Sequence, residues 1–315
     1  MQLQPNWPGG DKTKLIVSRS LPLFIAAATF IRMIKNRYWT KSPNDKINFI
    51  VETSVKIHSQ YDALYRPVLS LILSRSPGED HAEIIAKFAA IIGSFILLAD
   101  WLSITSLAKL LNVGPHVVVS QVDPLRSVID VPSDDSPIRL FHLSFRDYLV
   151  SKSAGDLQVN ETKTHESLAI KCFELMKRKL KQDICDLGSP GISRSDIDLD
   201  TVQKCIPPEV QYACLHWVQH LKLSLASSHD GDEVYYHKVL PEFRSDLFLP
   251  WLEVLCLIGK VSTSAEMMLE LRNLPLVSIC SVTTWSIMLT TILGRRASED
   301  YPILSRCNAV YSLLR

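Results

Sequence analysis

Apolar residues recur at helical spacing along almost the whole chain, and this pattern constrains the fold more than any other feature. From Leu21 to Ile34 they follow an i, i+3, i+4, i+7 rhythm, which is typical of an amphipathic helix. Similar patterns predict helices over 47–58 and 63–73, before a turn signal at 76–78. We therefore expect residues 1–76 to form a helical unit in a chain that is mainly α.

Residues 84–150 depart from this pattern, because two short β-prone runs follow three predicted helices. The expected elements are helices over 84–98, over 104–111 and from 115 to about 124 or a few residues beyond, strands over 127–131 and 138–142, and a last helix from Ser144. Ser103 can cap the second helix, and Pro115 is suited to the first position of the third. Three helices followed by a hairpin is the order of a winged helix-turn-helix domain. We expect this domain at the centre of the chain, between helical bundle units.

The C-terminal half is again helical in pattern. One face of a helix that begins near Thr164 holds Leu168, Cys172, Leu175, Met176 and Leu180. Lysines and an arginine between 171 and 181 line the other faces, which is typical of a solvated helix. Breaks at 188–191 and 207–208 and a polar loop at 227–232 separate further helices over 209–225 and 247–257. We expect a helical domain over 160–277 and a divergent tail over 278–315.

Charge and cysteine usage count against several classes of protein. The 34 Lys and Arg nearly balance the 33 Asp and Glu, so the chain as a whole has no electrostatic footprint for nucleic acid or an acidic membrane. The 7 cysteines are odd in number and contain no C-x-x-C pair. They fit buried free thiols in a reducing compartment better than a disulfide framework.

One stretch resembles a membrane segment. Leu274–Gly294 lacks charges and precedes two arginines, but it contains Pro275 and several Ser and Thr. These residues lower its transfer energy, so a buried helix is the expected state. The first ten residues are polar and proline-rich rather than basic and apolar, so we expect no signal peptide and a cytoplasmic location.

The motifs of nucleotide hydrolysis are missing from the sequence. A phosphate loop requires G-x-x-x-x-G-K-[ST], and the one Gly-Lys pair, Gly259-Lys260, has Val254 and Val261 at two required positions. No G-x-G-x-x-G or G-x-S-x-G string occurs. We expect no catalytic residues, no cofactor and no enzymatic activity in this chain.

A metal site has one weak candidate. Cys214, His216 and His220 lie close together in sequence, and the two histidines can share one helix face. They lack the neighbouring acidic residue of an H-E-x-x-H motif and a second group of ligands. Ordinary helix packing is the better interpretation, and we expect no metal.

Several strings along the chain resemble the NACHT–WD-repeat proteins of filamentous fungi, the vegetative-incompatibility class of the signal-transduction NTPases with numerous domains (STAND, NLR-like). They follow the family's order and cover roughly residues 1–277. The strings are 6–9, 21–29, 102–104, 107–111, 139–149, 183–185 with 190–191, and 211–214 with Trp217, Val218, His220 and Leu221.

The resemblance implies a position inside a larger signalling protein. Members carry an effector domain, a NACHT NTPase core, helical and winged-helix domains, and usually a WD40-type sensor. This chain resembles the segment from the distal end of the NACHT core to the domain before the WD repeats. It lacks the Walker A and Walker B motifs, and residues 278–315 cease to resemble the family, which is consistent with a truncated or mispredicted product.

The resemblance also implies a role for His142. In related NACHT proteins a histidine in a Phe-x-His-Leu-Ser-Phe string contacts the β-phosphate of bound ADP and holds the protein closed. The matching string here is Phe141–Phe145. An imidazole can donate to a phosphate oxygen, which would favour the closed state. The alternative is that His142 ends a strand of the wing and bonds the start of the next helix.

Two functions of different kinds remain. The first is a non-catalytic regulatory or scaffolding segment of a NACHT-type NTPase, which acts by protein–protein or intramolecular domain packing and meets ADP or ATP only when joined to a complete NACHT core. The second is a winged-helix nucleic-acid-binding protein. The predicted recognition helix, Pro115–Pro124, offers Gln121, His116 and Asp123 beside a valine surface. A major-groove helix needs cationic and amide side chains, so we expect no DNA binding.

Overall fold

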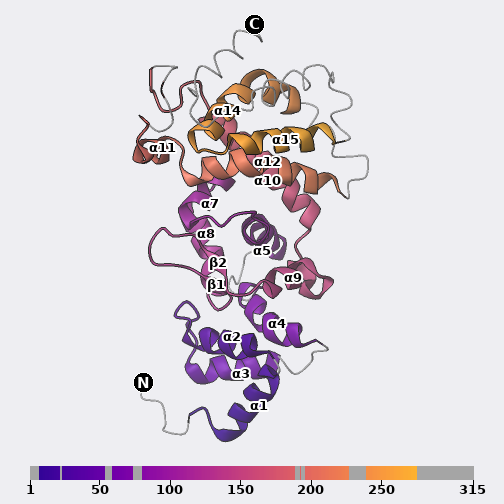
Figure 1. The fold of residues 1–315 in the computed structure, drawn as a ribbon. Coiled ribbons are helices and arrows are strands. Elements are labelled where there is room, and N and C mark those ends of the chain that lie inside the picture. The colour runs from indigo at the N-terminus through magenta and orange to yellow at the C-terminus, as the bar shows by residue number, and fades with distance from the viewer. Residues whose placement is uncertain are drawn as a thin grey trace. The chain divides into compact units, whose positions relative to one another are not determined.

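The computed structural model describes residues 7–274 apart from 22, 54–58, 74–79, 189–191, 193–195 and 227–238. Within these residues the chain is mainly α, with one two-stranded antiparallel sheet (Figure 1). The chain divides into two compact units. Unit 1 comprises residues 1–108 and 113–164, and unit 2 comprises residues 109–112 and 165–315.

Unit 1 begins with four helices that pack against one another. They are α1 (Gly10–Ser20), α2 (Phe24–Lys35), α3 (Pro43–Thr53) and α4 (Gln60–Leu73). The helix predicted over 21–34 is α2, but the apolar rhythm lies on its exposed side, since Phe24 is 93% and Ile31 is 53% exposed. The buried side carries Ala26, Phe30 and Met33. Residues 54–58 and 76–78, where a helix end and a turn are predicted, lie outside the described residues.

The helix predicted over 84–98 ends earlier and is not regular. It consists of α5 (His81–Phe88), a π-helical turn η1 (Ala89–Gly93) and α6 (Ser94–Ile96). Asp80 caps α5 by accepting the Ala82 N–H. At Gly93 the missing side chain leaves room for Val159, because a Cβ there would lie 3.3 Å from Val159 Cγ1.

Two short helices and their caps follow the prediction closely. In α7 (Ile104–Leu111), Ser103 Oγ accepts the Ser106 N–H at 3.1 Å. Asn112 adopts a φ of 58°, and the helix ends there. Pro115 is the first residue of α8 (Pro115–Val122), which passes into a 3-10 turn, η2 (Asp123–Leu125), instead of continuing to 124.

The predicted hairpin is present, with shorter strands. β1 (Ile129–Asp130) pairs antiparallel with β2 (Arg139–Leu140). The N–H of Ile138, inside the second predicted strand, donates to Leu102 O at 3.0 Å instead of to β1. After the hairpin come α9 (Ser144–Val150), which starts as predicted, and the 3-10 helix η3 (Lys152–Leu157).

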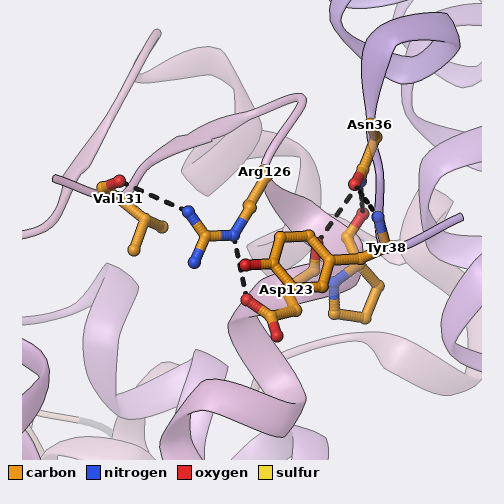
Figure 2. A network of polar contacts seen from close by, with 6 residues as sticks. Asn36, Tyr38, Asp123, Arg126 and Val131 are labelled. Carbon is orange, nitrogen blue, oxygen red and sulfur yellow. Dashed lines mark hydrogen bonds and ion pairs between the residues drawn. The ribbon is translucent and has the colours of Figure 1, made fainter. Parts of the chain in front are cut away.

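A polar network fixes the turn after α2 against η2 (Figure 2). Asn36 Nδ2 donates to Asp123 O at 3.3 Å, while Asn36 Oδ1 accepts the Tyr38 N–H at 2.9 Å. Arg126 Nε donates to Asp123 Oδ1 at 2.9 Å, and its guanidinium lies 4.7 Å from the Tyr38 ring centroid. The predicted domains 1–76 and 84–150 are therefore in contact within unit 1. Their separation as two domains stays a prediction.

Unit 2 is helical wherever the structure describes regular elements. These are α10 (Glu161–Lys179, from His165 on), α11 (Leu199–Cys205), α12 (Pro208–Leu225), the π-helical turn η5 (Phe243–Leu247), α14 (Phe248–Leu257) and α15 (Val261–Arg272). The predicted face of α10 is confirmed for Leu168, Cys172, Leu175 and Met176, which are buried, whereas Leu180 follows the helix and is half-buried. Trp217, Phe243 and Trp251 form an aromatic core.

Several predicted features lie outside the described residues. These are the break at 189–191, the loop at 227–232, the tail 278–315 and the uncharged stretch after Leu274. Among the helices that the structure describes, none has the length and apolar character needed to cross a membrane.

Candidate functional site

His142 lies between β2 and α9, and its exposed side chain is held by the start of the helix. The Ser144 N–H donates to His142 Nδ1 at 3.1 Å, and Ser144 Oγ lies 2.6 Å from the same nitrogen. The Phe145 N–H donates to His142 O at 3.2 Å. His142 thus follows the second strand and bonds the first turn of α9, as the alternative expects, and its part in nucleotide sensing stays a prediction.

These contacts decide which imidazole nitrogen carries the proton. Because the Ser144 N–H points at Nδ1, this nitrogen accepts, and in the neutral imidazole the proton is on Nε2. The Ser144 hydroxyl then donates to Nδ1 and accepts from Tyr65 Oη, which lies 2.7 Å from it. The result is a hydrogen-bond chain from Tyr65 on α4 to His142, with a donor N–H left at the exposed end.

The buried end of this hydrogen-bond chain is packed among aromatic rings. The Tyr65 ring is in contact with Phe145, at 5.1 Å between centroids, and with Tyr148, at 5.2 Å. Tyr148 Oη donates to Asp62 Oδ1 at 2.8 Å. Burial raises the pKa of both tyrosines, and the hydrogen bond to Asp62 adds to this effect at Tyr148. Both hydroxyls therefore remain protonated donors at neutral pH.

A cationic side chain lies beside the same strand end. The Arg32 guanidinium carbon is 3.7 Å from the ring centroid of Phe141, which precedes His142. Arg32 Nη1 is buried and has no hydrogen-bond partner among the described residues. The chain thus places a cation–π pair next to an exposed histidine.

Sequence reasoning identified His142 but missed the residues that hold it. Ser144 follows the histidine by two positions at a helix start, and such a spacing is a usable signal for local capping. Tyr65 and Arg32 come from α4 and α2, and their proximity depends on helix packing. The local pattern of the sequence has no signal for either.

The three residues of the weak metal candidate, Cys214, His216 and His220, have separate interaction partners in the structure. His220 is fully buried, and its two ring nitrogens face Tyr212 Oη at 2.7 Å and His165 Nδ1 at 2.9 Å. The ring of His216 is tilted against that of Tyr212, at 4.7 Å between centroids, and the backbone carbonyl of Cys214 accepts the Trp251 indole N–H. No group of three or more possible ligands gathers among the described residues.

Burial shapes the chemistry of this second histidine. Burial, with smaller contributions from the neighbouring His165 and His216, lowers the pKa of His220 to about 3. His220 is therefore neutral at physiological pH. Tyr212 can donate to its Nε2, and its Nδ1–H can donate to His165.

The other two sequence features also acquire definite structural roles. Gly259 adopts a φ of 71° after α14, and Lys260 precedes α15, so this Gly-Lys pair forms a turn between helices. On α8, the exposed residues are Pro115, His116 and Ser120, while Gln121 is partly buried.

Comparison of the chain with models of known protein families, with curated proteins and with solved structures gives no match.

Proposed function

We propose that this chain is a non-catalytic regulatory segment of a NACHT-type signal-transduction NTPase and that residues 84–150 are its winged-helix domain. The observation that carries the proposal is the exposed donor nitrogen of His142, held by Ser144 and Tyr65. A hydrogen-bond donor at this position suits a phosphate oxygen supplied by another domain. The helix–turn–helix α7–α8 followed by the β1–β2 hairpin supports the domain assignment.

In this proposal the histidine adds to a nucleotide site but cannot form one. Nucleotide affinity comes mainly from the backbone N–H groups, lysine and Mg²⁺ of a phosphate loop, which this sequence does not encode. One charge-assisted hydrogen bond contributes about 1.5–3 kcal/mol. This is less than the roughly 4–15 kcal/mol that association costs in translational and rotational freedom.

Calorimetry tests the proposal with two proteins, the chain alone and the chain joined to a complete NACHT core. We expect the chain alone to bind neither ADP nor ATP and to hydrolyse neither. In the joined protein, His142→Ala should weaken ADP binding by about 10-fold to 100-fold, which corresponds to the loss of that hydrogen bond. His116→Ala, a change of the exposed histidine on α8, is the matched control and should leave affinity unchanged.

Two results would refute the proposal. Saturable ADP binding by the chain alone would reveal a phosphate site of its own. Equal ADP affinity of the joined protein and its His142→Ala variant would remove the proposed role of the histidine.

Nucleic-acid binding is the alternative, because α7 and α8 form a helix–turn–helix. The exposed residues of α8 contain no Lys or Arg, and the nearby Arg126 is paired with Asp123. Phosphate contacts dominate DNA affinity and require cations. We expect no mobility shift of duplex DNA at low salt, and micromolar binding that weakens steeply with added salt would favour the alternative.

A further inference from the structure

The loop between β1 and β2 contains a serine–proline pair outside the candidate site. Residues 133–137 are exposed and belong to no helix or strand. Ser136 precedes Pro137, and an exposed arginine, Arg139, lies three positions after the serine. This loop is therefore a part of the hairpin on which an enzyme from solution can act.

Pro137 restricts the backbone of the serine before it. A residue that precedes proline is held in extended conformations, and proline itself has a fixed φ and no N–H. The catalytic groove of a protein kinase binds its acceptor segment in an extended conformation. Proline-directed kinases accept proline directly after the acceptor and favour a cation three positions after it, which bonds to an anionic group of the kinase. Ser136, Pro137 and Arg139 provide these features in this order.

Ser136 is held at the surface by a turn with Asp134. The Ser136 N–H donates to Asp134 Oδ1 at 3.3 Å. Hydrogen bonds from the hydroxyl and the N–H of Ser136 hold the pKa of the Asp134 carboxyl below its ordinary value. The contact lies in water, so a kinase can replace it at little cost.

The loop is anchored on the other side of the serine. Ile138 is 1% exposed, and its N–H donates to Leu102 O at 3.0 Å. A kinase that reads Arg139 therefore needs this end of the loop to open locally, whereas the residues from Ser133 to Pro137 are already accessible.

We propose that Ser136 is a phosphorylation site for a proline-directed serine kinase, an inference that does not depend on the proposed function. The Ser136 hydroxyl oxygen attacks the γ-phosphorus of ATP, and the bond from that phosphorus to the oxygen of the β-phosphate breaks. The hydroxyl proton passes to the catalytic aspartate of the kinase, and ADP leaves. The phosphate adds a charge of about −1.5 to −2 beside Asp134 and Asp135, so it repels the carboxylate that Ser136 binds in the unmodified chain.

Ser42 and Pro43 provide a contrast within the described residues. Ser42 caps α3, because its Oγ donates to Asp45 Oδ2 at 2.6 Å and accepts the Asp45 N–H at 3.2 Å. Pro43 is the first residue of that helix, so the segment after the serine is helical instead of extended. The residue three positions after Ser42 is the acidic Asp45. This pair tests whether serine followed by proline is sufficient without an extended backbone and a cation.

The experiment incubates the full chain with a cyclin-dependent kinase, its cyclin and ATP, and locates phosphate by mass spectrometry. Ser76 and Ser189, which precede proline outside the described residues, are replaced by alanine in every variant. We expect phosphate on Ser136 and none on Ser42. An NMR titration of the phosphorylated chain should show a higher pKa for Asp134, because this carboxyl has lost a donor and gained a negative neighbour.

Single substitutions separate the features that the kinase reads. Pro137→Ala keeps the acceptor hydroxyl and should abolish phosphorylation. Arg139→Ala should slow it about 10-fold, the effect of one charge-assisted hydrogen bond, and Arg139→Lys should restore most of the rate. Ser133→Ala, a change of the other exposed serine in the loop, is the matched control and should react like the parent chain.

Four results would overturn the proposal. They are an absence of phosphate on Ser136, phosphorylation of Ser42 at an equal rate, an unchanged rate in Pro137→Ala, and an unchanged pKa of Asp134 in the phosphorylated chain.

Discussion

Each unit contains a tyrosine hydroxyl at the head of a hydrogen-bond chain to a histidine, and the two chains end differently. In unit 1 the chain from Tyr65 passes through Ser144 and ends at His142, whose ring is exposed. In unit 2 the chain from Tyr212 passes through His220 and ends at the buried His165. The two hydrogen-bond chains therefore differ in what they can do. The exposed ring of His142 can bind a ligand or a proton, whereas the buried rings of His220 and His165 can bond only to groups inside the protein.

The difference in solvent access sets the energetic weight of each bond. A buried donor or acceptor that loses its partner costs about 1–3 kcal/mol, because water cannot replace the partner. At an exposed ring water takes over at little cost. The comparison thus predicts large effects of substitution in unit 2 and small effects in unit 1.

The largest effect is expected from His220→Ala. This change removes a fully buried ring and leaves Tyr212 Oη and His165 Nδ1 without the bonds that they make to it. Two such losses destabilise unit 2 by roughly 3 kcal/mol. Urea unfolding gives the total, and amide hydrogen exchange assigns the loss to unit 2. A loss below about 1 kcal/mol would show that the buried hydrogen bonds of Tyr212, His220 and His165 contribute little to the free energy of unfolding.

Acid should act on the same histidine. Its pKa is about 3 in the folded chain and about 6.5 when unfolded, so the unfolded state binds more protons below pH 6.5. Stability is therefore lost as the pH falls through 6.5 and continues to fall until about pH 3. Between pH 7 and pH 5 the loss from His220 is about 2 kcal/mol.

Urea unfolding at both pH values, on wild type and on His220→Ala, isolates this contribution. The variant should lose less stability than wild type over the same interval, by about 2 kcal/mol. Equal losses in the two proteins would assign the acid sensitivity to other groups.

The paired changes Tyr212→Phe and Tyr65→Phe each remove the tyrosine hydroxyl with which one of the two hydrogen-bond chains begins. Tyr212→Phe removes the partner of the buried His220 Nε2 and should cost about 1–3 kcal/mol. Tyr65→Phe leaves Ser144 bonded to His142 and should cost about 0.5–1.5 kcal/mol. Unfolding free energies of both variants decide the order. A reversed order would contradict the role given to burial.

The smallest effect is expected from His142→Ala. The exposed ring accepts local hydrogen bonds from the N–H and the hydroxyl of Ser144 at the start of α9, and water can replace it there, so the free energy of unfolding should fall by no more than about 1 kcal/mol. Chemical denaturation measures it, with His116→Ala as the matched exposed control. A loss of several kcal/mol would show that His142 is a structural residue of unit 1.

The sequence was informative where local chemistry decides the structure. The cap at Ser103, the start of α8 at Pro115 and the buried face of α10 are all present as predicted. Each depends on residues within a few positions of one another. The contact between His142 and the Ser144 N–H is equally local, since it spans two positions.

The predictions from sequence were wrong where contacts with a distant segment determine the local structure. The second predicted strand is shorter because the Ile138 N–H bonds Leu102 instead of the hairpin. In α2 two apolar sides compete, and packing against α3 and α4 buries the side of Phe30 and Met33 instead of the side of Phe24. Helical spacing alone cannot choose between them.

The network around Asn36 has a consequence for the order of events during synthesis. Asn36 donates to the carbonyl of Asp123, a residue 87 positions later in the chain. The space at Gly93 is filled by Val159, which is added later still. While a ribosome extends the chain, α1 to α4 therefore leave the exit tunnel before these partners exist. Unit 1 can complete its fold only after residue 159 has emerged, and until then its early helices have only the contacts that they make with one another.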